Sequence, residues 1–479
     1  MTRQGLVGIG VAAAADAVAG RRPLRWTHSP MQVLAALQGR RHTFCLDSAD
    51  PSHPDGRFSM VGCDPWAVYR ARGSEIRIET DVGRVDFDHP LDGLGAVLAA
   101  VKAPPPPEPL PFAGGAVGFF AYDLGRAIER LPADTVDDLG TDDVFLGLYD
   151  WVVVFDHQER RWHLAATARC PDTEPLAALL DRAQAFLSEQ MREVPSLGTA
   201  PDIAPAEAVS GFTREAYLAA LDRVIEHIYA GDIYQVNLSQ RFAVEVQASS
   251  FDLYRSLRRH TRAVFSAYVS GVGMDVLSLS PERFLRVRGR EVQTCPIKGT
   301  RPRGTTPAED AALAAELCDS TKDAAELAMI VDLERNDLGR VCEAGTVEVA
   351  DHAALYTLAT VHHTVTRVVG QVRESVDAAA LLRATFPGGS ITGAPKIRSM
   401  EIIEDLEPTR RGVYTGSVGY LGYDGRMDLN IAIRTVTLKD GVAHVQAGGG
   451  IVADSDPKAE YEETLTKARA LLAALGATV

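Results

Sequence analysis

The stretch Pro195 to Gly211 does most to constrain how this chain folds, because it is rich in proline, alanine and serine. Such a composition is typical of a linker between two regions. A clean amphipathic helix is predicted directly after it, over 213–231, with Thr213 as the N-cap and Gly231 as the stop. Its apolar stripe consists of Tyr217, Leu221, Val224, Ile225 and Ile228. We therefore expect two regions, residues 21–195 and 211–475.

The region before the linker mixes helices with strands. The patterns predict helices over 30–37 and 174–191, strands over 67–71, 75–79 and 151–155, a stiff connector over 104–109, and a glycine-rich bend between packed strands over 112–125. Beyond the linker, strands alternate with helices and no repeat is present. The alternation of apolar and polar residues over 428–438 suggests many antiparallel strands. The expected fold class is α+β.

The charge of the chain limits its partners. It has 479 residues, with 49 basic against 64 acidic side chains and a formal net charge of −15. That balance excludes nonspecific binding to nucleic acid or to an anionic membrane. Any anion site should therefore be a local basic pocket.

The cysteines and the first residues indicate a cytoplasmic protein. The six cysteines are scattered, with no C-x-x-C pair, so neither a disulfide framework nor a zinc site is expected. The run 5–15 is rich in glycine and alanine rather than leucine and is followed by Asp16, so we do not expect a signal peptide. No other stretch is long and apolar enough to span a bilayer.

One candidate site lies in the stretch 296–304, Pro-Ile-Lys-Gly-Thr-Arg-Pro-Arg-Gly. Gly299 lets the backbone approach a ligand, and the Gly-Thr amides and the arginines offer donors to carboxylates. Lys298 would direct an amine at that anion. The alternative is a surface loop whose basic residues are solvated.

Two predicted helices carry carboxylates. One runs over 322–337 and places Asp323 and Glu326 on one face; the other follows the cap Ser455-Asp-Pro and places Glu460 and Glu463 together with Lys467. If these faces meet, the converging carboxylates require a cation, and their oxygens suit magnesium. The alternative is two solvated helix faces.

Further candidates lie in three other places. Glu282 follows a strand and either acts as a general acid or pairs with Arg283. Arg411 begins a predicted strand, and Tyr414, Arg434 and a glycine-rich turn over 446–450 would together hold a carboxylate. We interpret the turn over 386–396, which precedes a helix, as architecture.

Taken together, the motifs resemble the chorismate-utilising enzymes, a family that includes aminodeoxychorismate synthase component I and anthranilate synthase component I. The resemblance covers nearly the whole chain from about residue 21. The motifs that carry it are 231–241, Ser280-Pro-Glu-Arg-Phe284, Pro296-Ile-Lys-Gly-Thr300, 329–338, 386–396, and Asp454-Ser-Asp-Pro with Glu460-Tyr-Glu-Glu463. The resemblance implies a large two-subdomain α/β sandwich with mostly antiparallel sheets and flanking helices. It also makes residues 21–195 an N-terminal region of the anthranilate synthase component I type and 211–475 the chorismate-binding catalytic region.

The same resemblance assigns roles to the candidates. It implies a magnesium ion on Glu326 and Glu463, with Glu460, and Asp323 as a further candidate, beside them. His363 is implied as the active-site histidine and Glu282 as the general acid/base. The implied substrate-binding residues are Gln235, Gly299, Thr300, Tyr414, Arg434, Gly448, Gly449 and Gly450.

Two positions discriminate within the family. Gln235 stands where the isochorismate and salicylate branches are expected to carry a water-activating lysine. Lys298 stands where the anthranilate branch usually has alanine, and so resembles the aminodeoxychorismate branch. The implied reaction is attack of neutral Lys298 on C2 of chorismate, loss of the C4 hydroxyl, and addition of ammonia at C4. Arginines and magnesium near Lys298 would lower its pKa, whereas carboxylates would raise it.

The resemblance also implies partners. The segment 45–49, with Leu46, Asp47 and Ser48, resembles the part of related enzymes that forms a tryptophan pocket, so tryptophan is a candidate ligand. The sequence has no glutaminase signature and no room for a pyridoxal-phosphate lyase domain. We therefore expect ammonia from a separate glutamine amidotransferase subunit or from solution, and p-aminobenzoate for folate synthesis to be completed by another protein.

Overall fold

The computed structural model describes residue 6 and residues 17–271, 273–357 and 361–478. The glycine- and alanine-rich run 5–15, predicted not to be a signal peptide, lies almost entirely outside the described residues. No helix in the described part of the chain is long and apolar enough to cross a membrane.

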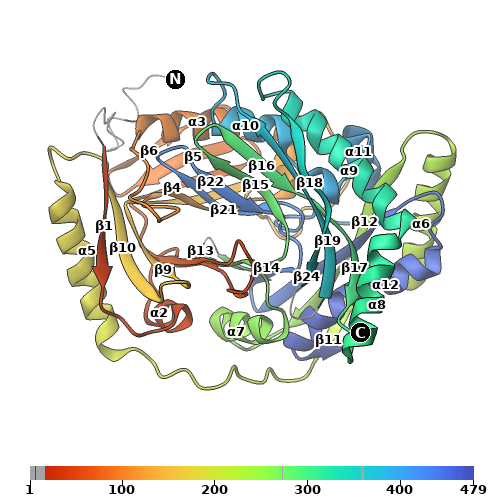
Figure 1. Cartoon of the computed structure of the whole chain (residues 1–479), viewed down its shortest axis with the longest axis horizontal. Helices are drawn as coiled ribbons and strands as arrows, with labels where there is room; N and C mark the ends of the chain where they lie inside the picture. Colours follow the sequence, from red (N-terminus) through yellow and green to blue (C-terminus); the bar gives the residue numbers. More distant parts are fainter. Residues whose placement is uncertain (1–5, 7–16, 272, 358–360, 479) are drawn as a thin grey trace.

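Two large sheets face each other, and helices cover their outer sides (Figure 1). In spatial order, the first sheet consists of β1 (Val18–Leu24), β10 (Arg161–Ala168), β9 (Trp151–Asp156), β3 (Phe58–Gly62), β2 (Phe44–Asp47), β13 (Phe265–Gly271), β14 (Met274–Ser280), β23 (Thr435–Lys439), β24 (Val442–Ile451), β12 (Gln235–Glu245), β11 (Ala206–Ser210) and β25 (Ala477–Thr478), with β20 (Gly393–Ala394) paired to β12. Only the pairing of β11 with β25 is parallel among its described ladders.

The second sheet is antiparallel throughout its described ladders. In spatial order, it consists of β17 (Ile297–Pro302), β19 (Val361–Gln371), β16 (Glu291–Cys295), β15 (Arg283–Arg288), β22 (Met427–Asn430), β21 (Ser417–Gly422), β7 (Gly115–Phe120), β8 (Val144–Tyr149), β4 (Ala67–Arg72), β5 (Glu75–Thr80) and β6 (Gly83–Asp86), with β18 (Glu348–Thr357) paired to β19. The structure thus confirms the expected α+β class.

Both sheets combine strands from the two sides of the linker. In the first, β2 pairs with β13, so that Cys45 lies opposite Tyr268. In the second, β7 pairs with β21, so that Val117 lies opposite Tyr420. The two regions are therefore joined through continuous hydrogen-bond ladders as well as through the linker.

The helices and short 3₁₀ turns have the following bounds: α2 (Pro30–Ala36), α3 (Pro90–Ala100), η1 (Tyr122–Leu124), α4 (Gly125–Ile128), α5 (Leu176–Gln190), η2 (Met191–Glu193), α6 (Arg214–Tyr229), α7 (Ser250–His260), α8 (Pro307–Asp319), α9 (Thr321–Gly339), α10 (Ala378–Thr385), η3 (Gly389–Ile391), α11 (Lys396–Leu406) and α12 (Pro457–Ala474). Three predicted helix ends are confirmed. Thr213 accepts from the amide of Ala216 at the start of α6, and Gly231 ends the turn after α6. Asp456 caps α12, and a proline follows it.

The core is divided by the sheets into layers. Apolar side chains of both sheets, among them Phe44, Phe119, Phe145 and Val276, pack between them. A second cluster packs α3 and α10 on the outer side of the second sheet, and a third packs α2, α5, α7 and α12 on the outer side of the first. Burial of these faces is the main force that holds the helices on the sheets.

One sequence prediction about strands is wrong. The glycine-rich stretch 112–125 is not a bend at its centre but contains the buried strand β7. A Cβ at Gly118 would lie 2.0 Å from the carbonyl oxygen of Phe145, so this glycine serves close strand packing. The alternating stretch 428–438 is two strands, β22 and β23, which belong to different sheets. The chain crosses between the sheets at 431–434, where Arg434 has φ 49°.

The linker is shorter than predicted, because residues 206–210 form β11. In Figure 1 the connector after α5 runs along the lower edge, beneath α7. Arg255 of α7 donates to the carbonyls of Gly198 (2.7 Å) and Thr199 (3.0 Å), and Arg259 donates to Asp202 (3.1 Å). The connector is thus fixed to the helix that it passes.

Candidate active site

Lys298 lies at a bulge in strand β17. The register with β19 shifts between Lys298 and Thr300, and the bulge residue Gly299 has φ 70°. A Cβ at Gly299 would also lie 2.6 Å from Leu317 Cδ1. Conformation and space both require glycine here, and such a bulge re-aims the side chain next to it.

The Lys298 amine has few partners. The side chain is half-buried, and its Nζ donates to the carbonyl of Ser390 at 3.4 Å, a long contact. Burial lowers the pKa of Lys298 below its ordinary value, against the carboxylates of Glu326 and Glu282, which raise it. The net shift of the Lys298 pKa, which the sequence left open, is thus downward. Burial rather than the arginines is its largest cause.

The neighbouring arginines bind carboxylates of α8 and α9. Arg301 Nε donates to Glu316 (2.7 Å) and its Nη2 donates to Asp323 (3.2 Å). Arg303 forms a two-pronged pair with Asp310, both distances being 2.7 Å. These ion pairs hold the loop against the helices.

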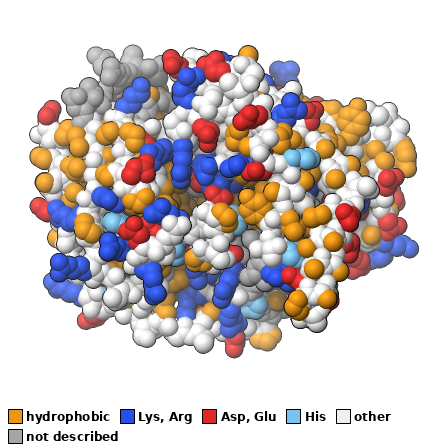
Figure 2. All heavy atoms as spheres, in the orientation of Figure 1, with side chains coloured by type: hydrophobic (Ala, Val, Ile, Leu, Met, Phe, Trp, Pro, Cys, Tyr) orange, Lys and Arg blue, Asp and Glu red, His pale blue; other side chains and the backbone are white. Residues whose placement is uncertain are grey.

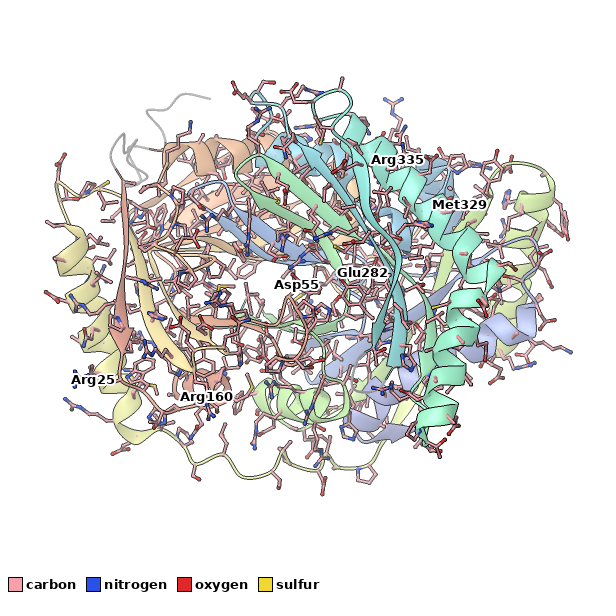
Figure 3. All side chains as sticks on the ribbon, viewed as in Figure 1. Arg25, Asp55, Arg160, Glu282, Met329 and Arg335 are labelled. Atoms are coloured by element: carbon pink, nitrogen blue, oxygen red, sulfur yellow. The ribbon has the colours of Figure 1, made fainter. Side chains whose placement is uncertain are left out.

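Glu282 is 4% exposed and forms no ion pair within the described residues. Burial raises its pKa to about 7, and the Lys298 ammonium opposes that rise. The alternative predicted from sequence, pairing with Arg283, is wrong: Arg283 binds Asp428 (2.9 Å) and Asp55 (2.9 Å) instead. Figure 3 labels Glu282 near the centre of the view. A buried carboxyl with a pKa near neutrality is suited to general acid catalysis.

The crossing segment 431–434 is hydrogen-bonded to the segments that carry Glu282 and Tyr414. The amide of Ile431 donates to the carbonyl of Glu282 (3.0 Å), and the carbonyl of Ala432 accepts from Thr415 (2.9 Å). The residues 411–416 form a turn, and β21 begins only at Ser417, so the predicted strand start at Arg411 is wrong.

Arg434 is half-buried and forms no ion pair in the described part of the chain. Burial lowers its pKa, and no carboxylate offsets that effect. Burial, and after it the charge of the nearby Arg434, lowers the pKa of His363 to about 4. An uncompensated guanidinium in such a place is suited to a carboxylate of a ligand.

His363 is oriented by the Lys298 loop. Its Nδ1 lies 2.9 Å from Thr300 Oγ1 and 3.4 Å from the carbonyl of Gly299, whereas its buried Nε2 has no partner. The lowered pKa keeps the imidazole neutral at neutral pH. Its Nε2 is therefore free to contact a ligand.

The glycines 448–450 lie in strand β24, so the predicted glycine-rich turn is wrong. They pair with β12: Gly450 lies opposite Asn237, and Gly448 lies opposite Ser239. A Cβ at Gly450 would lie 2.4 Å from Gln235 Nε2. The glycines thus make room for side chains on β12 and α12. Because β23 pairs with β24 only as far as Val445, the backbone groups of 448–450 that point away from β12 are not used by that ladder.

The carboxylates on α9 and α12 approach each other. Burial raises the pKa of Glu326, and the charge of Glu460 raises it further. Burial alone would raise the pKa of Glu463, but Lys467, 2.6 Å away, lowers it below its ordinary value. Within the described residues, no three His, Cys, Asp or Glu side chains are grouped tightly enough to hold a metal. The oxygen donors nevertheless fit the chemistry of magnesium.

One residue beside Lys298 was missed in the sequence. Ser390 lies in the turn interpreted as architecture, and its carbonyl accepts from Lys298. The position has no local sequence signal, because it is identified only by what the fold places beside it.

A comparison with protein families decides which family this is. A family model described as chorismate binding enzyme matches residues 42–473. The chain belongs to the chorismate-binding enzymes.

Individual chorismate-binding enzymes are similar to this chain over most of its length. Aminodeoxychorismate synthase component 1 from Salmonella typhimurium is 42% identical over 433 residues, which cover 89% of this chain and 91% of the relative. Anthranilate synthase component 1 from Cereibacter sphaeroides is 40% identical over 455 residues, covering 92% and 91%. Sequence identity therefore does not separate the two activities.

Solved structures of chorismate-binding enzymes share the fold. Anthranilate synthase component I from Streptococcus pneumoniae has a TM-score of 0.79 at 34% identity and covers 87% of this chain and 92% of its own. The menaquinone-specific isochorismate synthase from Escherichia coli has a TM-score of 0.72 at 17% identity, which shows the fold alone; it covers 97% of this chain and 95% of its own. The two-sheet architecture is thus that of the family.

A cavity lies between the sheets, and Lys298 is not among its lining residues. Its volume is about 400 Å³, and Leu46, Asp47 and Ser48 line it together with Arg283. Asp47 is buried and accepts from Arg258 Nε at 2.6 Å. Figure 2 shows basic side chains grouped near the middle of the displayed face, with acidic ones among them.

Proposed function

We propose that this chain is an aminodeoxychorismate synthase component I, which converts chorismate and ammonia to 4-amino-4-deoxychorismate. The observation that carries the proposal is Lys298, a half-buried amine with a lowered pKa, beside the buried acid Glu282. An amine must be neutral to act as a nucleophile, and a lowered pKa increases its neutral fraction. Relatives named aminodeoxychorismate synthase component 1 support the same activity.

In the first step Lys298 forms a bond from its nitrogen to C2 of chorismate while the C4–O bond breaks. Glu282 gives its proton to the departing oxygen, so that water leaves. The proton released from the Lys298 nitrogen returns to the Glu282 carboxylate. Glu282 therefore acts as acid and then as base, as its pKa of about 7 allows.

The two carboxylates of chorismate would be held by different groups. We assign the enolpyruvyl carboxylate to Arg434 and Tyr414, because Arg434 has no carboxylate partner of its own. We assign the ring carboxylate to Gly299 and Thr300. His363 is bonded to Thr300 and presents its unpartnered Nε2 as a neutral donor or acceptor.

Magnesium would be held by Glu326 and Glu463, with Glu460 beside them. Bound there, it would neutralise the carboxylates and the ring carboxylate of the substrate. Addition of magnesium should raise the midpoint of thermal unfolding, and Glu326→Gln should abolish that rise. An equal rise in this variant would contradict the assignment.

Ammonia should come from a separate glutamine amidotransferase subunit or from solution, since relatives bear the name component 1. We place the protein in the cytoplasm and in p-aminobenzoate and folate synthesis. We further propose tryptophan as the ligand of the cavity at Leu46, Asp47 and Ser48; calorimetric titration with tryptophan would test this.

The product identifies the reaction. The protein should be incubated with chorismate, magnesium and ammonium, and the product identified by mass spectrometry and chromatography. 4-Amino-4-deoxychorismate is expected. Anthranilate with pyruvate would instead show anthranilate synthase component I, the alternative that the second group of relatives supports. No turnover would show a non-catalytic paralogue that binds tryptophan or chorismate.

A second experiment tests the covalent step alone. Chorismate supplied without ammonia should add mass to the intact protein, and peptide mapping should place the addition at Lys298. An addition at another residue, or none, would contradict the proposed step.

A further inference from the structure

Glu334 is a buried carboxyl to which the proposed mechanism assigns no role. It lies on α9, is 7% exposed, and forms no ion pair within the described residues. Burial raises its pKa well above the ordinary value. Asp337, one turn further along the helix, differs because the Lys396 ammonium binds it at 2.5 Å. A buried glutamate without such a cation is held as the neutral acid.

Strand β16 makes the first connection between Glu334 and the proposed general acid. Thr294 Oγ1 donates to Glu334 Oε2 at 3.0 Å. The next residue of β16, Cys295, pairs with Arg283 at the start of β15. Glu282 directly precedes Arg283. The end of β16 that bonds Glu334 therefore lies beside the segment that carries Glu282.

The turn η3 makes the second connection. A Cβ at Gly389 would lie 3.5 Å from Glu334 Cγ, so the Glu334 side chain packs directly against this turn. The next residue, Ser390, forms a hydrogen bond with the Glu282 side chain, and its carbonyl accepts from Lys298 Nζ. One residue of the turn thus contacts Glu334, and its neighbour contacts both Glu282 and Lys298.

The two carboxyls also interact electrostatically. Burial is the largest cause of the raised pKa of Glu334, and the charge of Glu282 comes next. The charge of Asp337 raises this pKa further, whereas the hydrogen bond from Thr294 and the charge of Lys396 lower it. Two like charges in one buried place are unfavourable, so the pair retains a proton after the first of the two groups has ionised.

We propose that Glu334 is a positioning residue that shares a proton with Glu282 and so keeps the general acid protonated; this rests on the proposed function. When the pair carries one negative charge, the remaining proton is distributed between the two carboxyls. While the charge lies on Glu334, Glu282 still holds the proton that it gives to the C4 oxygen. The transfer moves one proton from the Glu334 carboxyl to the Glu282 carboxylate and changes no other bond. The pair thus extends the pH range over which Glu282 acts as an acid.

The pH dependence of the first chemical step tests this role. Formation of the Lys298 adduct from chorismate without ammonia should be followed by mass spectrometry from pH 6 to pH 9, in wild type and in Glu334→Gln. The glutamine keeps an acceptor for Thr294 but has no proton to share. The ratio of the variant rate to the wild-type rate cancels the titration of Lys298. This ratio should stay within about 2-fold of one at pH 6 and fall by about 5-fold or more at pH 9.

Infrared spectra test the shared proton without any enzymatic activity. At pH 8 the wild-type protein should show the C=O band of a protonated, buried carboxyl that is absent from Glu334→Gln. In Glu282→Gln the band of Glu334 should disappear at a lower pH than in wild type. The reason is that the charge that raises the pKa of Glu334 has been removed.

Glu404→Gln is the matched control for loss of a buried glutamate. Glu404 lies on α11 and is 4% exposed, but it accepts from Thr135 Oγ1 (2.8 Å) and pairs with Arg126. This variant should lose stability, and its rate ratio to wild type should be the same at every pH.

Two results would overturn the inference. A rate ratio for Glu334→Gln that does not change with pH would show that Glu334 only supports the fold. An infrared band of Glu334 that is absent, or that does not respond to Glu282→Gln, would show that the two carboxyls share no proton. If the wild-type protein forms no adduct, the proposed function itself fails, and the infrared titration still decides whether the two carboxyls are coupled.

Discussion

Two arginines in the second region differ in how they are satisfied. Arg411 is buried and donates to both oxygens of Glu407 (2.9 and 2.7 Å) and to the carbonyls of Asn237 and Ile391. Arg434 is half-buried and has no ion pair among the described residues. The first guanidinium is part of the scaffold, and the second is available to a ligand.

Two lysines repeat the contrast. Lys396 donates to Asp337 (2.5 Å) and to the carbonyls of Thr385 (3.0 Å) and Pro387 (2.8 Å). Lys298 makes one long contact with a carbonyl. The cations with several hydrogen-bond partners fix the turn at 386–396. Those with few partners face the proposed site that this turn borders. The number of hydrogen-bond partners, rather than the residue type, thus distinguishes the cations that hold the fold from those that we propose for the site.

The largest effect is expected for Lys298→Ala. This variant should fold normally, form no covalent adduct and lose aminodeoxychorismate formation by a factor of more than about 10³, because a nucleophile is not replaced by solvent. Product formation with ammonium measures it, and Lys102→Ala, which alters an exposed lysine after α3, is the control. Formation of aminodeoxychorismate at the wild-type rate would show that the covalent mechanism is wrong.

Arg411→Ala tests the arginine that has hydrogen-bond partners within the protein. Removing it leaves Glu407 buried without its cation, which should lower the free energy of unfolding by about 3–5 kcal/mol. Urea denaturation measures this loss. In the fraction that folds, the KM for chorismate should stay near the wild-type value. A stable variant with a strongly raised KM would reverse the roles assigned to the two arginines.

The pH dependence of stability tests the environment of Glu282. Burial raises its pKa from 4.5 to about 7. As pH rises through that window, the unfolded chain loses this proton before the folded chain does, so the group destabilises the fold progressively. Glu282→Gln does not titrate. Relative to wild type, its free energy of unfolding should therefore rise by about 2–3 kcal/mol between pH 5 and pH 8.

Parallel urea denaturation series at the two pH values give the comparison. A constant difference between the two proteins would show that Glu282 is ionised in the folded state at both pH values.

Arg434→Ala tests the unsaturated arginine. It should raise the KM for chorismate roughly 100-fold, since a charge-assisted contact to a carboxylate is lost, and it should change stability little because no protein partner is left unpaired. Steady-state kinetics with chorismate varied, and a thermal melt of the same sample, check both parts. A large loss of stability with an unchanged KM would make Arg434 structural.

The smallest effect is expected for Arg301→Ala. Its partners Glu316 and Asp323 are partly exposed, and such ion pairs contribute about 1 kcal/mol or less. Stability and both KM values should stay close to wild type. A KM change comparable with that of Arg434→Ala would show that Arg301 contacts the substrate.

Local features of the sequence predicted local structure well. The caps at Thr213 and Asp456 and the apolar stripe on α6 depend on residues within one or two turns, so pattern alone locates them. The residues around Lys298 were chosen as a site from their chemistry and from family resemblance. Their roles in binding and catalysis stay predictions.

Features that depend on distant partners were not predictable in this way. Residues on both sides of 431–434 alternate as expected for strands. That the chain leaves one sheet and enters the other at 431–434 is evident only once both sheets are known. The glycines 448–450 were interpreted as a turn because glycine often marks one, whereas Gln235 and the residues of α12 impose their small size. Ser390 could be found only once the fold had placed it beside Lys298.

The ladders that cross the linker bear on how the chain is made. β2 and β7 leave the ribosome long before their partners β13 and β21 have been synthesised. Until then each is an open strand edge, and such edges pair readily with other chains. A fragment that ends in the connector 194–205 should therefore aggregate when it is produced alone. Produced together in one cell, the two fragments should assemble through the same ladders into an active enzyme.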